Sequence, residues 1–293
     1  MRILITGKNG QLGQSIKKIV DERKFPNLIN YEFVFIGREE LNLEDIASIK
    51  PYFDINEFNI IINCAAYTKV DKAEENQKQA NLINHTAVRE LAKIAKTNNI
   101  KLIHISTDFV FNGLKEGPYN ENDATSPLSI YGETKLAGEL AIMETMNLNS
   151  LIIRTGWVYS EFGNNFVKKI LKLALTSGTL DIVSDQYGTP TYAYDLAFSI
   201  LYIITTEKFL ENNKSSEILH YSNKGESSWY EFAKEIIRIS ETNCQLSPIK
   251  TKDYPLPAKR PKYSVLSNKK ISGTYDLVIK HWKDALKECL KNL

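Results

Sequence analysis

The sequence predicts an α/β fold in which helices cover both faces of a doubly wound parallel sheet, and three observations favour it. The first half of the chain alternates short apolar runs with helical patterns. The apolar runs are continuous stretches of Ile, Val and Leu, which are typical of parallel strands buried on both faces. A glycine-rich turn, Gly7–Gly13, directly follows the first run and opens a helical pattern, as in dinucleotide-binding folds.

Five strands and four helices are expected in this half. The expected strands are Arg2–Thr6, Tyr31–Ile36, Ile60–Asn63, Lys101–Ser106 and Leu151–Arg154. The expected helices are Gln11–Glu22, Leu43–Phe53, Asn76–Thr97 and Ile130–Thr145. Apolar side chains recur at helical spacing in the first and third of these helices, so one face of each is expected to pack on the sheet.

The pattern changes after about residue 157, where turn-rich stretches separate the helical ones. Helices are expected at Phe166–Leu175, Tyr194–Thr206, Trp229–Ser240 and His281–Leu290. Ser228 and Glu231 form a capping box that fixes one helix start, and the prolines of residues 248–261 predict a surface loop. We expect residues 1–157 to form a Rossmann-like NAD(P)-binding domain. Residues 158–293 are expected to form mainly a smaller α/β substrate-binding part, interleaved with the first.

Composition and charge argue against several classes of protein. A net charge of +2 and a pI near 8.2 give no bias toward nucleic acid or a membrane surface. The first apolar run is too short for a signal peptide, and no run of about 18 apolar residues suggests a transmembrane helix, so a cytoplasmic protein is expected. The three cysteines lack CxxC spacing and the four histidines lack HxxxH spacing, which argues against disulfide scaffolds, zinc sites and metal hydrolases.

Two segments at expected strand ends suit a dinucleotide. Gly7, Gly10 and Gly13 allow a tight turn whose backbone can approach a pyrophosphate at the positive end of the following helix. After the third strand, the small side chains within Asn63–Thr68 leave room for a cofactor against the backbone. Cys64, in this segment, is expected to be a small apolar filler.

The end of the second strand indicates which cofactor is used. Arg38 stands where an arginine can accommodate the 2′-phosphate of NADPH, whereas an acid there would accept from the 2′-hydroxyl of NADH. Glu39 and Glu40 follow Arg38 directly and weaken this signal. We expect NADPH and leave NADH open as the alternative.

Tyr131 and Lys135 are four residues apart on an expected helix, which places a phenol and an ammonium on one face. A phenol titrates near ~10, and a nearby cation favours the phenolate. Lys135 is therefore expected to bring the pKa of Tyr131 toward the neutral range, where the phenol can exchange protons in catalysis. Thr107 closes the fourth strand and is expected to bind a substrate carbonyl or to tune Tyr131.

The chain resembles the extended short-chain dehydrogenase/reductase superfamily and, within it, the dTDP-4-dehydrorhamnose reductase family, nearly from end to end. The stretches that carry the resemblance are Gly7–Gly13, Asn63–Glu74, Ser106–Phe111, Tyr131–Glu139, Arg154–Tyr159, Gly163–Phe166, Asp185–Thr191 and Ala258–Pro261. The most specific among them are Tyr-Gly-Glu-Thr-Lys from Tyr131 and Asp-Gln-Tyr-Gly-Thr-Pro-Thr from Asp185.

The resemblance implies NADPH-dependent reduction of the C4 ketone of dTDP-4-dehydro-L-rhamnose to dTDP-L-rhamnose, for cell-surface polysaccharide synthesis. It implies that Tyr131 protonates the developing alkoxide, that Lys135 binds the nicotinamide ribose, and that Thr107 tunes Tyr131. The implied cofactor-binding residues are Gly7, Gly10, Gln11, Leu12, Gly13, Arg38, Asn42, Leu43, Ala65, Ala66, Tyr67, Thr68, Tyr131 and Lys135. The implied substrate-binding residues are Thr107, Asp108, Trp157, Asn165, Phe166, Gln186 and Arg260, with Arg260 on the diphosphate.

Some positions depart from the family pattern. Asn42 stands where members often have an acid before the adenine-facing residue. Some members bind magnesium between subunits through glutamates, but the matching positions here are Ser15 and Tyr194, so no metal is expected and a homodimer is left open. Phe109, rather than an acid, follows Asp108, which argues against a dehydratase. A reductase or epimerase of another nucleotide-linked deoxysugar, and a non-catalytic regulatory subunit, remain as alternatives.

Overall fold

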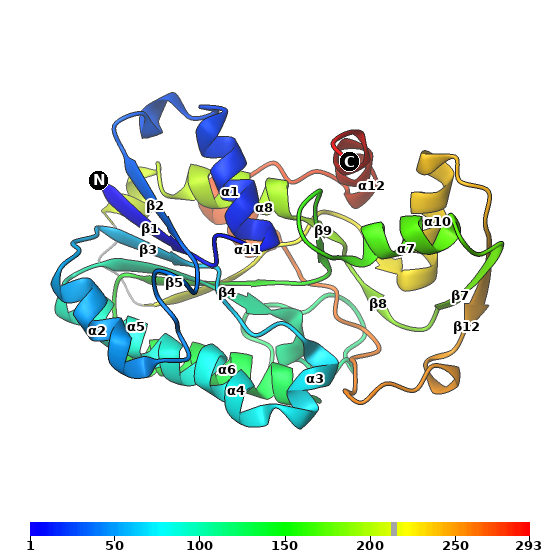
Figure 1. Ribbon diagram of the computed structural model, residues 1–293, viewed down its shortest axis with the longest axis horizontal. Coiled ribbons are helices and arrows are strands. Elements are labelled where there is room, and N and C mark those ends of the chain that lie inside the picture. Colours follow the sequence, from blue (N-terminus) through cyan, green and yellow to red (C-terminus); the bar gives the residue numbers. More distant parts are fainter. Residues whose placement is uncertain (212–215) are drawn as a thin grey trace.

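A parallel sheet of six strands forms the centre of the computed structural model, which describes residues 1–211 and 216–293 (Figure 1). The strands are β1 (Arg2–Thr6), β2 (Glu32–Ile36), β3 (Ile60–Asn63), β4 (Lys101–Thr107), β5 (Ser150–Thr155) and β10 (Glu217–His220). Their order is β10-β5-β4-β3-β1-β2, and every neighbouring pair is parallel. The chain adds β2 on one side of β1 and then β3, β4 and β5 on the other, so the order reverses beside β1.

Helices cover both faces of this sheet, which confirms the predicted doubly wound fold (Figure 1). One face carries α1 (Gln11–Asp21), α8 (Ala193–Ile203) and α11 (Lys269–Tyr275), and the other carries α2 (Ile46–Asp54), α5 (Ala87–Thr97) and α6 (Ile130–Thr145). Ile16, Leu196 and Ile271 belong to the first buried layer, and Leu91 and Ile142 belong to the second. In α1 and α5 the buried residues recur at helical spacing, as the sequence predicts.

The single helix expected over Asn76–Thr97 is wrong, because this stretch is interrupted. It comprises α4 (Gln77–Asn81), a π-helical turn η2 (Leu82–Thr86) and α5, and a further helix, α3 (Val70–Glu75), precedes it. The side chain of Asn84, in η2, accepts from Tyr67 N at 2.8 Å and donates to Tyr67 O at 3.1 Å. The interrupted helix therefore holds the loop after β3 in place, and π-helical turns are frequent at functional sites.

A smaller layer is built from the second half of the chain. Its helices α7 (Phe166–Ala174), α10 (Trp229–Ser240) and α12 (Trp282–Lys291) enclose Tyr159, Phe232 and Trp282. Two-stranded ladders join it: β6 (Val158–Tyr159) with β9 (Thr191–Tyr192), β8 (Tyr187–Gly188) with β11 (Ser227–Ser228), and β7 (Thr179–Val183) with β12 (Gln245–Ile249). The predicted capping box of Ser228 and Glu231 is confirmed.

The predicted loop over residues 248–261 needs a correction, because Pro248 and Ile249 end β12. A proline is tolerated there since β12 pairs with β7 on one side only. The remaining elements are short: η1 (Pro26–Leu28), η3 (Asp108–Val110), α9 (Glu207–Leu210) and η4 (Thr251–Asp253).

The second half of the chain also returns to the large sheet. The strand β10 pairs with β5 at the edge, and α8 packs against α1. Both segments follow residue 157, so the two halves of the sequence share one sheet layer. Across residues 1–211 and 216–293, no helix combines the length and apolar character needed to cross a bilayer.

Candidate active site

A cavity of about 820 Å³ opens at the carboxyl ends of β1, β3, β4 and β5. This is where ligands bind in open α/β sheets. The predicted site residues that line it are Gly7, Gly10, Gln11, Leu12, Arg38, Asn42, Leu43, Ala65, Ala66, Thr68, Thr107, Asp108, Tyr131, Lys135, Trp157 and Arg260. Those that do not line it are Gly13, Tyr67, Asn165, Phe166 and Gln186.

Close packing explains the glycines of the first turn. Gly7 has φ +71°, a left-handed conformation that glycine adopts without strain, and a Cβ there would lie 2.9 Å from Ala65 N. A Cβ on Gly13 would lie 2.4 Å from Gly7 O. Gly13 is therefore needed for the contact between the turn and α1, which agrees with its position outside the cavity lining.

Arg38 lies at the cavity with its guanidinium in solvent. Its side chain is 73% exposed, and Nη2 lies 3.5 Å from Glu44 Oε1. Glu40, one of the two acids that weaken the NADPH signal, is bound to Lys8 and accepts from Gly37 N at 2.8 Å. Lys8 and Gly37 thus hold Glu40 in place, and Arg38 is not paired with it.

The predicted pair of Tyr131 and Lys135 lies on α6, which begins at Ser129. The Ser129 side chain accepts from Gly132 N at 3.3 Å and caps the helix. The Tyr131 ring packs edge-on against Phe109, with 5.7 Å between the ring centroids. Lys135 lies one turn later and is only 1% exposed.

The expectation that Lys135 lowers the pKa of Tyr131 is wrong in this structure. The Lys135 ammonium donates to Ile105 O at 2.6 Å and lies 3.1 Å from His104 Nε2, so it faces β4. Burial raises the pKa of Tyr131 to about 12, a hydrogen bond from Thr107 opposes this shift, and the Asp108 carboxylate adds to it. Burial also lowers the pKa of Lys135 to about 8.

A chain of buried polar contacts runs beneath the Lys135 ammonium. Thr6 Oγ1 donates to Asn63 Oδ1 at 2.6 Å, and Asn63 Nδ2 lies 3.0 Å from His104 Nδ1. Burial and the Lys135 charge hold the pKa of His104 well below its usual range, so its imidazole is neutral. The chain links β1, β3 and β4 to α6. The missing HxxxH spacing argued only against a metal site, but a histidine such as His104, inside a strand buried on both faces, needs polar partners.

Thr107 and Asp108 lie where β4 ends. Thr107 Oγ1 donates to Asp108 Oδ1 at 3.1 Å and accepts from Phe109 N at 3.2 Å. Asp108 is 2% exposed, and burial raises its pKa to about 6, against the effect of hydrogen bonds from Ser264 and Thr107. A Cβ on Gly156 would lie 2.6 Å from Asp108 Cγ, so a glycine is required where β5 passes this carboxyl group.

A buried ion pair between Arg154 and Glu139 lies near the carboxyl ends of β4 and β5. Arg154 Nε donates to Glu139 Oε1 at 2.9 Å, and Nη2 donates to Oε2 at 2.6 Å. Both side chains are almost fully buried, and Ser106 Oγ also donates to Glu139. The pair ties β5 to α6, and thus holds the helix that carries Tyr131 and Lys135.

Arg260 reaches the cavity from the C-terminal half. Its guanidinium makes two parallel contacts to the Asp71 carboxylate, with Nη1 to Oδ1 at 3.0 Å and Nη2 to Oδ2 at 2.8 Å. Nη1 also donates to Ala258 O at 2.9 Å. The hydrogen bond from Arg260 lowers the pKa of Asp71. Asp71 therefore orients Arg260, the residue predicted to bind the diphosphate. Asp71 was not among the predicted site residues.

Asn165 joins the two halves of the molecule. Its side-chain oxygen caps α7 by accepting from Lys168 N at 3.2 Å, and its Nδ2 donates to Gln11 Oε1 at 2.9 Å. Gln11 Nε2 also donates to Val158 O at 3.2 Å. One residue of the glycine turn thus anchors the segment that follows β5.

Two predicted substrate residues outside the cavity lining contact other side chains of the second half. Gln186 Nε2 donates to Thr251 Oγ1 at 3.1 Å. The ring centroid of Phe166 is 4.6 Å from that of Trp229. Trp229 itself lines the cavity, although the sequence analysis noted it only as the start of a helix. The capping box places Trp229 at the first position of α10. An aromatic side chain directly after such a cap is the signal that could have predicted this site residue.

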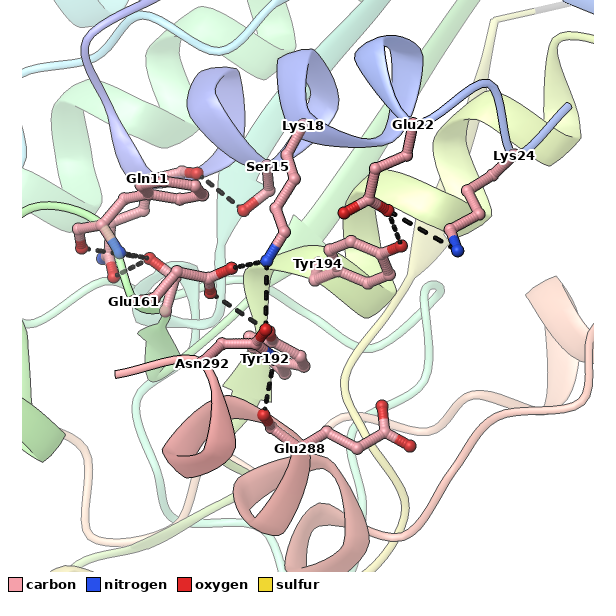
Figure 2. Close-up of polar contacts among 12 residues, drawn as sticks. Gln11, Ser15, Lys18, Glu22, Lys24, Glu161, Tyr192, Tyr194, Glu288 and Asn292 are labelled. Carbon is pink, nitrogen blue, oxygen red and sulfur yellow. Dashed lines mark hydrogen bonds and ion pairs between the residues drawn. The ribbon is translucent and has the colours of Figure 1, made fainter.

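The positions compared with magnesium ligands form a different set of contacts, which Figure 2 shows. Ser15 Oγ donates to Gln11 O at 2.9 Å, and Tyr194 Oη donates to Glu22 Oε2 at 2.9 Å. The Lys18 ammonium lies between them and donates to Glu161 Oε1 at 2.7 Å. In the described parts of the chain, no three His, Cys, Asp or Glu side chains are grouped as metal ligands.

The doubly wound sheet, the glycine turn after β1, and Tyr131 and Lys135 on α6 agree with the short-chain dehydrogenase/reductase class that the motifs resemble. Residues 1–293 match the family described as RmlD substrate binding domain, and the chain belongs to this family. The resemblance found in the motifs is confirmed.

Named relatives and solved structures agree with this membership. The chain is 37% identical over 289 residues to a dTDP-4-dehydrorhamnose reductase of Sinorhizobium fredii, covering 97% of this chain and 95% of the relative. It is similar to the crystal structure of a dTDP-4-dehydrorhamnose reductase from Clostridium acetobutylicum, with 39% identity, a TM-score of 0.91, and coverage of 100% and 99%. It is also similar to that from Bacillus anthracis in complex with NADP, with 34% identity, a TM-score of 0.91, and coverage of 100% and 99%.

Proposed function

We propose that the protein reduces the C4 ketone of dTDP-4-dehydro-L-rhamnose to dTDP-L-rhamnose with NADPH. The observation that carries this proposal is the meeting of Gly10, Thr107 and Tyr131 in one cavity, because it brings a dinucleotide turn to a proton donor. The substrate class follows from the reductases that the chain resembles over nearly its full length. The Bacillus anthracis structure with NADP supports the choice of cofactor.

The residues at the first turn fit a dinucleotide. The N-cap of α1 is Gly10, and no side chain caps this helix, so its first N–H groups are available to a pyrophosphate. Arg38 would hold the 2′-phosphate, and Asn42, Leu43 and Ala65–Thr68 would line the adenosine and nicotinamide parts. NADPH supplies the hydride when it is bound. NADH is the alternative cofactor.

Tyr131 supplies the proton. With a pKa raised to about 12, the phenol is protonated at neutral pH and can donate as the negative charge develops on the C4 oxygen. The carbon gains the hydride and the oxygen gains the Tyr131 proton. Thr107 stabilises the phenolate that forms by hydrogen bonding, and Lys135 binds the nicotinamide ribose. The phenolate then regains a proton from solvent.

The substrate is held from the second half of the chain. We assign Arg260 to the diphosphate because its fork-shaped guanidinium matches phosphate oxygens and Asp71 already orients it. The remaining substrate contacts that we propose are Asp108, Trp157, Asn165, Phe166 and Gln186. Of these five, Asp108 and Trp157 line the cavity.

A direct assay tests the proposal. Purified protein with NADPH should convert dTDP-4-dehydro-L-rhamnose into dTDP-L-rhamnose, with the C4 configuration assigned by NMR. A relative from Streptomyces niveus, 33% identical, is named a dTDP-4-keto-6-deoxy-D-glucose reductase, so that sugar is the competing substrate to assay. Turnover of that sugar alone would change the substrate. An epimerase or a regulatory subunit would consume no NADPH with either sugar. That result would retire the reductase.

The wider role is proposed on the same basis. A relative from Bacillus subtilis, 37% identical, is named a spore coat polysaccharide biosynthesis protein, which supports a role in supplying a sugar for polysaccharide. We place the reaction in the cytoplasm, and we keep the homodimer as a prediction that sedimentation of the purified protein would test. No nucleic-acid or membrane partner is part of the proposal.

A further inference from the structure

We propose that Trp229 is a positioning residue, which holds the indole of Trp157 against the sugar end of the cavity. The inference rests on the proposed function, because it assigns a residue to the same substrate site. Trp157 is a proposed substrate contact that follows β5, and Trp229 is the first residue of α10. Both side chains line the cavity.

The backbone of Trp157 is strained. Its φ is +51°, in the left-handed region that a bulky side chain rarely adopts without compensating contacts. Five other non-glycine residues in the described parts of the chain have positive φ, and Trp157 is the one that lines the cavity. Strain of this kind persists only where the surroundings hold it, and it gathers at functional sites.

A stack with Trp229 supplies the holding contact. The ring centroids of Trp157 and Trp229 are 3.4 Å apart and their planes differ by 3°. Gly188 packs against the same indole, since a Cβ there would lie 2.5 Å from Trp157 Cε2. Gly188 pairs with Ser227 in the ladder of β8 and β11, and Trp229 follows that ladder directly. The ladder of β8 and β11 therefore positions both Gly188 and Trp229, which confine the Trp157 indole.

Trp229 is itself fixed in place. In the capping box, Ser228 Oγ accepts from Glu231 N at 3.1 Å and Glu231 Oε2 accepts from Ser228 N at 2.7 Å. The ring of Phe166 packs on its indole. A residue held this rigidly can impose an orientation on its neighbour.

The location of the stack distinguishes positioning from ordinary core packing. Both indoles are only half-buried and face the cavity, whereas Trp282 is buried inside the smaller layer. The residue before Trp157 is Gly156, which packs on Asp108. A shift of the Trp157 backbone would thus disturb the wall beside Asp108 and Thr107, where the sugar carbonyl is proposed to lie.

The test uses Trp229→Leu, which removes the stack, and Trp229→Phe, which keeps a smaller one. Two stacked indoles give an exciton couplet in the far-ultraviolet circular dichroism spectrum, and Trp229→Leu should abolish it. The KM for the dTDP-sugar should rise roughly two- to tenfold, the range that an aromatic pair contributes, while the Kd for NADPH should stay unchanged. Trp229→Phe should recover most of the KM. Trp282→Phe, which replaces the tryptophan outside the stack, should keep the couplet.

Three results separate this inference from the proposed function. No couplet in the wild-type protein would overturn the stack itself. A lost couplet with an unchanged sugar KM, or with equal weakening of NADPH and sugar, would overturn the positioning role. If the wild-type protein turns over no dTDP-sugar, the proposed function fails. The positioning role fails with it only if dTDP-L-rhamnose, titrated by calorimetry, binds wild type no more tightly than Trp229→Leu.

Discussion

The Lys135 ammonium lies 3.1 Å from His104 Nε2 and donates to the adjacent Ile105 carbonyl, so a neutral histidine lies beside this buried cation. An ammonium that is 1% exposed needs such acceptors, because burial favours its neutral form. His104 in turn contacts Asn63, and Asn63 contacts Thr6 beside the glycine turn. The charge proposed to bind the nicotinamide ribose is therefore supported by residues from three strands.

The pH dependence of kcat/KM should show this arrangement. With its pKa lowered to about 8, Lys135 loses its proton as the pH rises through that value, so kcat/KM should fall above about pH 8. Tyr131, with a pKa raised to about 12, stays protonated throughout and should set no limb in the same range. A profile that is flat to pH 10 would contradict the role given to the Lys135 charge.

Replacing His104 should shift the pH at which kcat/KM falls, which is the basic limb of the profile. His104→Phe removes one acceptor of the buried ammonium, which makes the charged form less stable, so the basic limb should shift to lower pH. His104→Gln keeps an acceptor and should shift it less. A structural effect alone would lower kcat/KM equally at every pH, and a parallel drop in both variants would rule out the positioning of Lys135 by His104.

Tyr131→Phe should remove the proton donor and keep the ring that packs on Phe109. General acid catalysis contributes roughly 10²–10⁴-fold, so turnover of the dTDP-sugar should fall on that scale. NADPH affinity, measured by fluorescence titration, should change little. Near wild-type turnover would show that another group supplies the proton.

Arg38→Ala should weaken the preference for NADPH. A hydrogen bond to a charged group contributes about 1.5–3 kcal/mol, so the ratio of kcat/KM for NADPH over NADH should fall roughly ten- to a hundredfold. Arg23→Ala is the matched control, because Arg23 is exposed and lies outside the cavity. An unchanged ratio would make Arg38 a surface residue.

Arg260→Ala should weaken dTDP far more than NADPH. A bidentate guanidinium contact to a diphosphate contributes about 1.5–3 kcal/mol, so the Kd for dTDP should rise at least about tenfold in calorimetry at fixed salt. Lys259→Ala, at the exposed neighbouring position, controls for the loss of positive charge. Equal losses in the two variants would indicate general charge attraction rather than a contact by Arg260.

Glu139→Gln should destabilise the fold. It leaves the Arg154 guanidinium buried without its counter-charge, and breaking such a pair costs about 3–5 kcal/mol in the free energy of unfolding. The exposed pair of Lys50 and Asp54 offers the control: Asp54→Asn should cost less than about 1 kcal/mol. Urea unfolding followed by circular dichroism measures both, and similar costs would mean that the buried pair contributes no more than the exposed one.

Much of the large sheet could be predicted from the sequence because its signals are local. The bounds expected for β1, β3, α6 and α10 match the structure, since each has a clear apolar run or a cap. The strand β10 was missed because Glu217–His220 is too short and too polar to read as a buried strand alone. Glu217–His220 is a strand because it pairs with β5, and this pairing is a tertiary contact that the local sequence does not show.

The candidate site was predicted unevenly for the same reason. Residues at strand ends, such as Thr107 and Arg38, could be found because strand order brings those ends together. Trp229 and Asp71 act through partners far away in sequence, and no local pattern links either residue to its partner. The pKa of Tyr131 was predicted in the wrong direction because spacing on a helix shows which residues share a face, but not where a lysine ammonium points.

The position of β10 at the edge of the large sheet also has a consequence for synthesis. Until the ribosome has made residue 220, the Ile-rich strand β5 has no partner on its outer side, although both of its faces are apolar. Such an unpaired edge is a template for association between chains. The nascent protein therefore depends on its last third to protect the outer edge of a strand made near its midpoint.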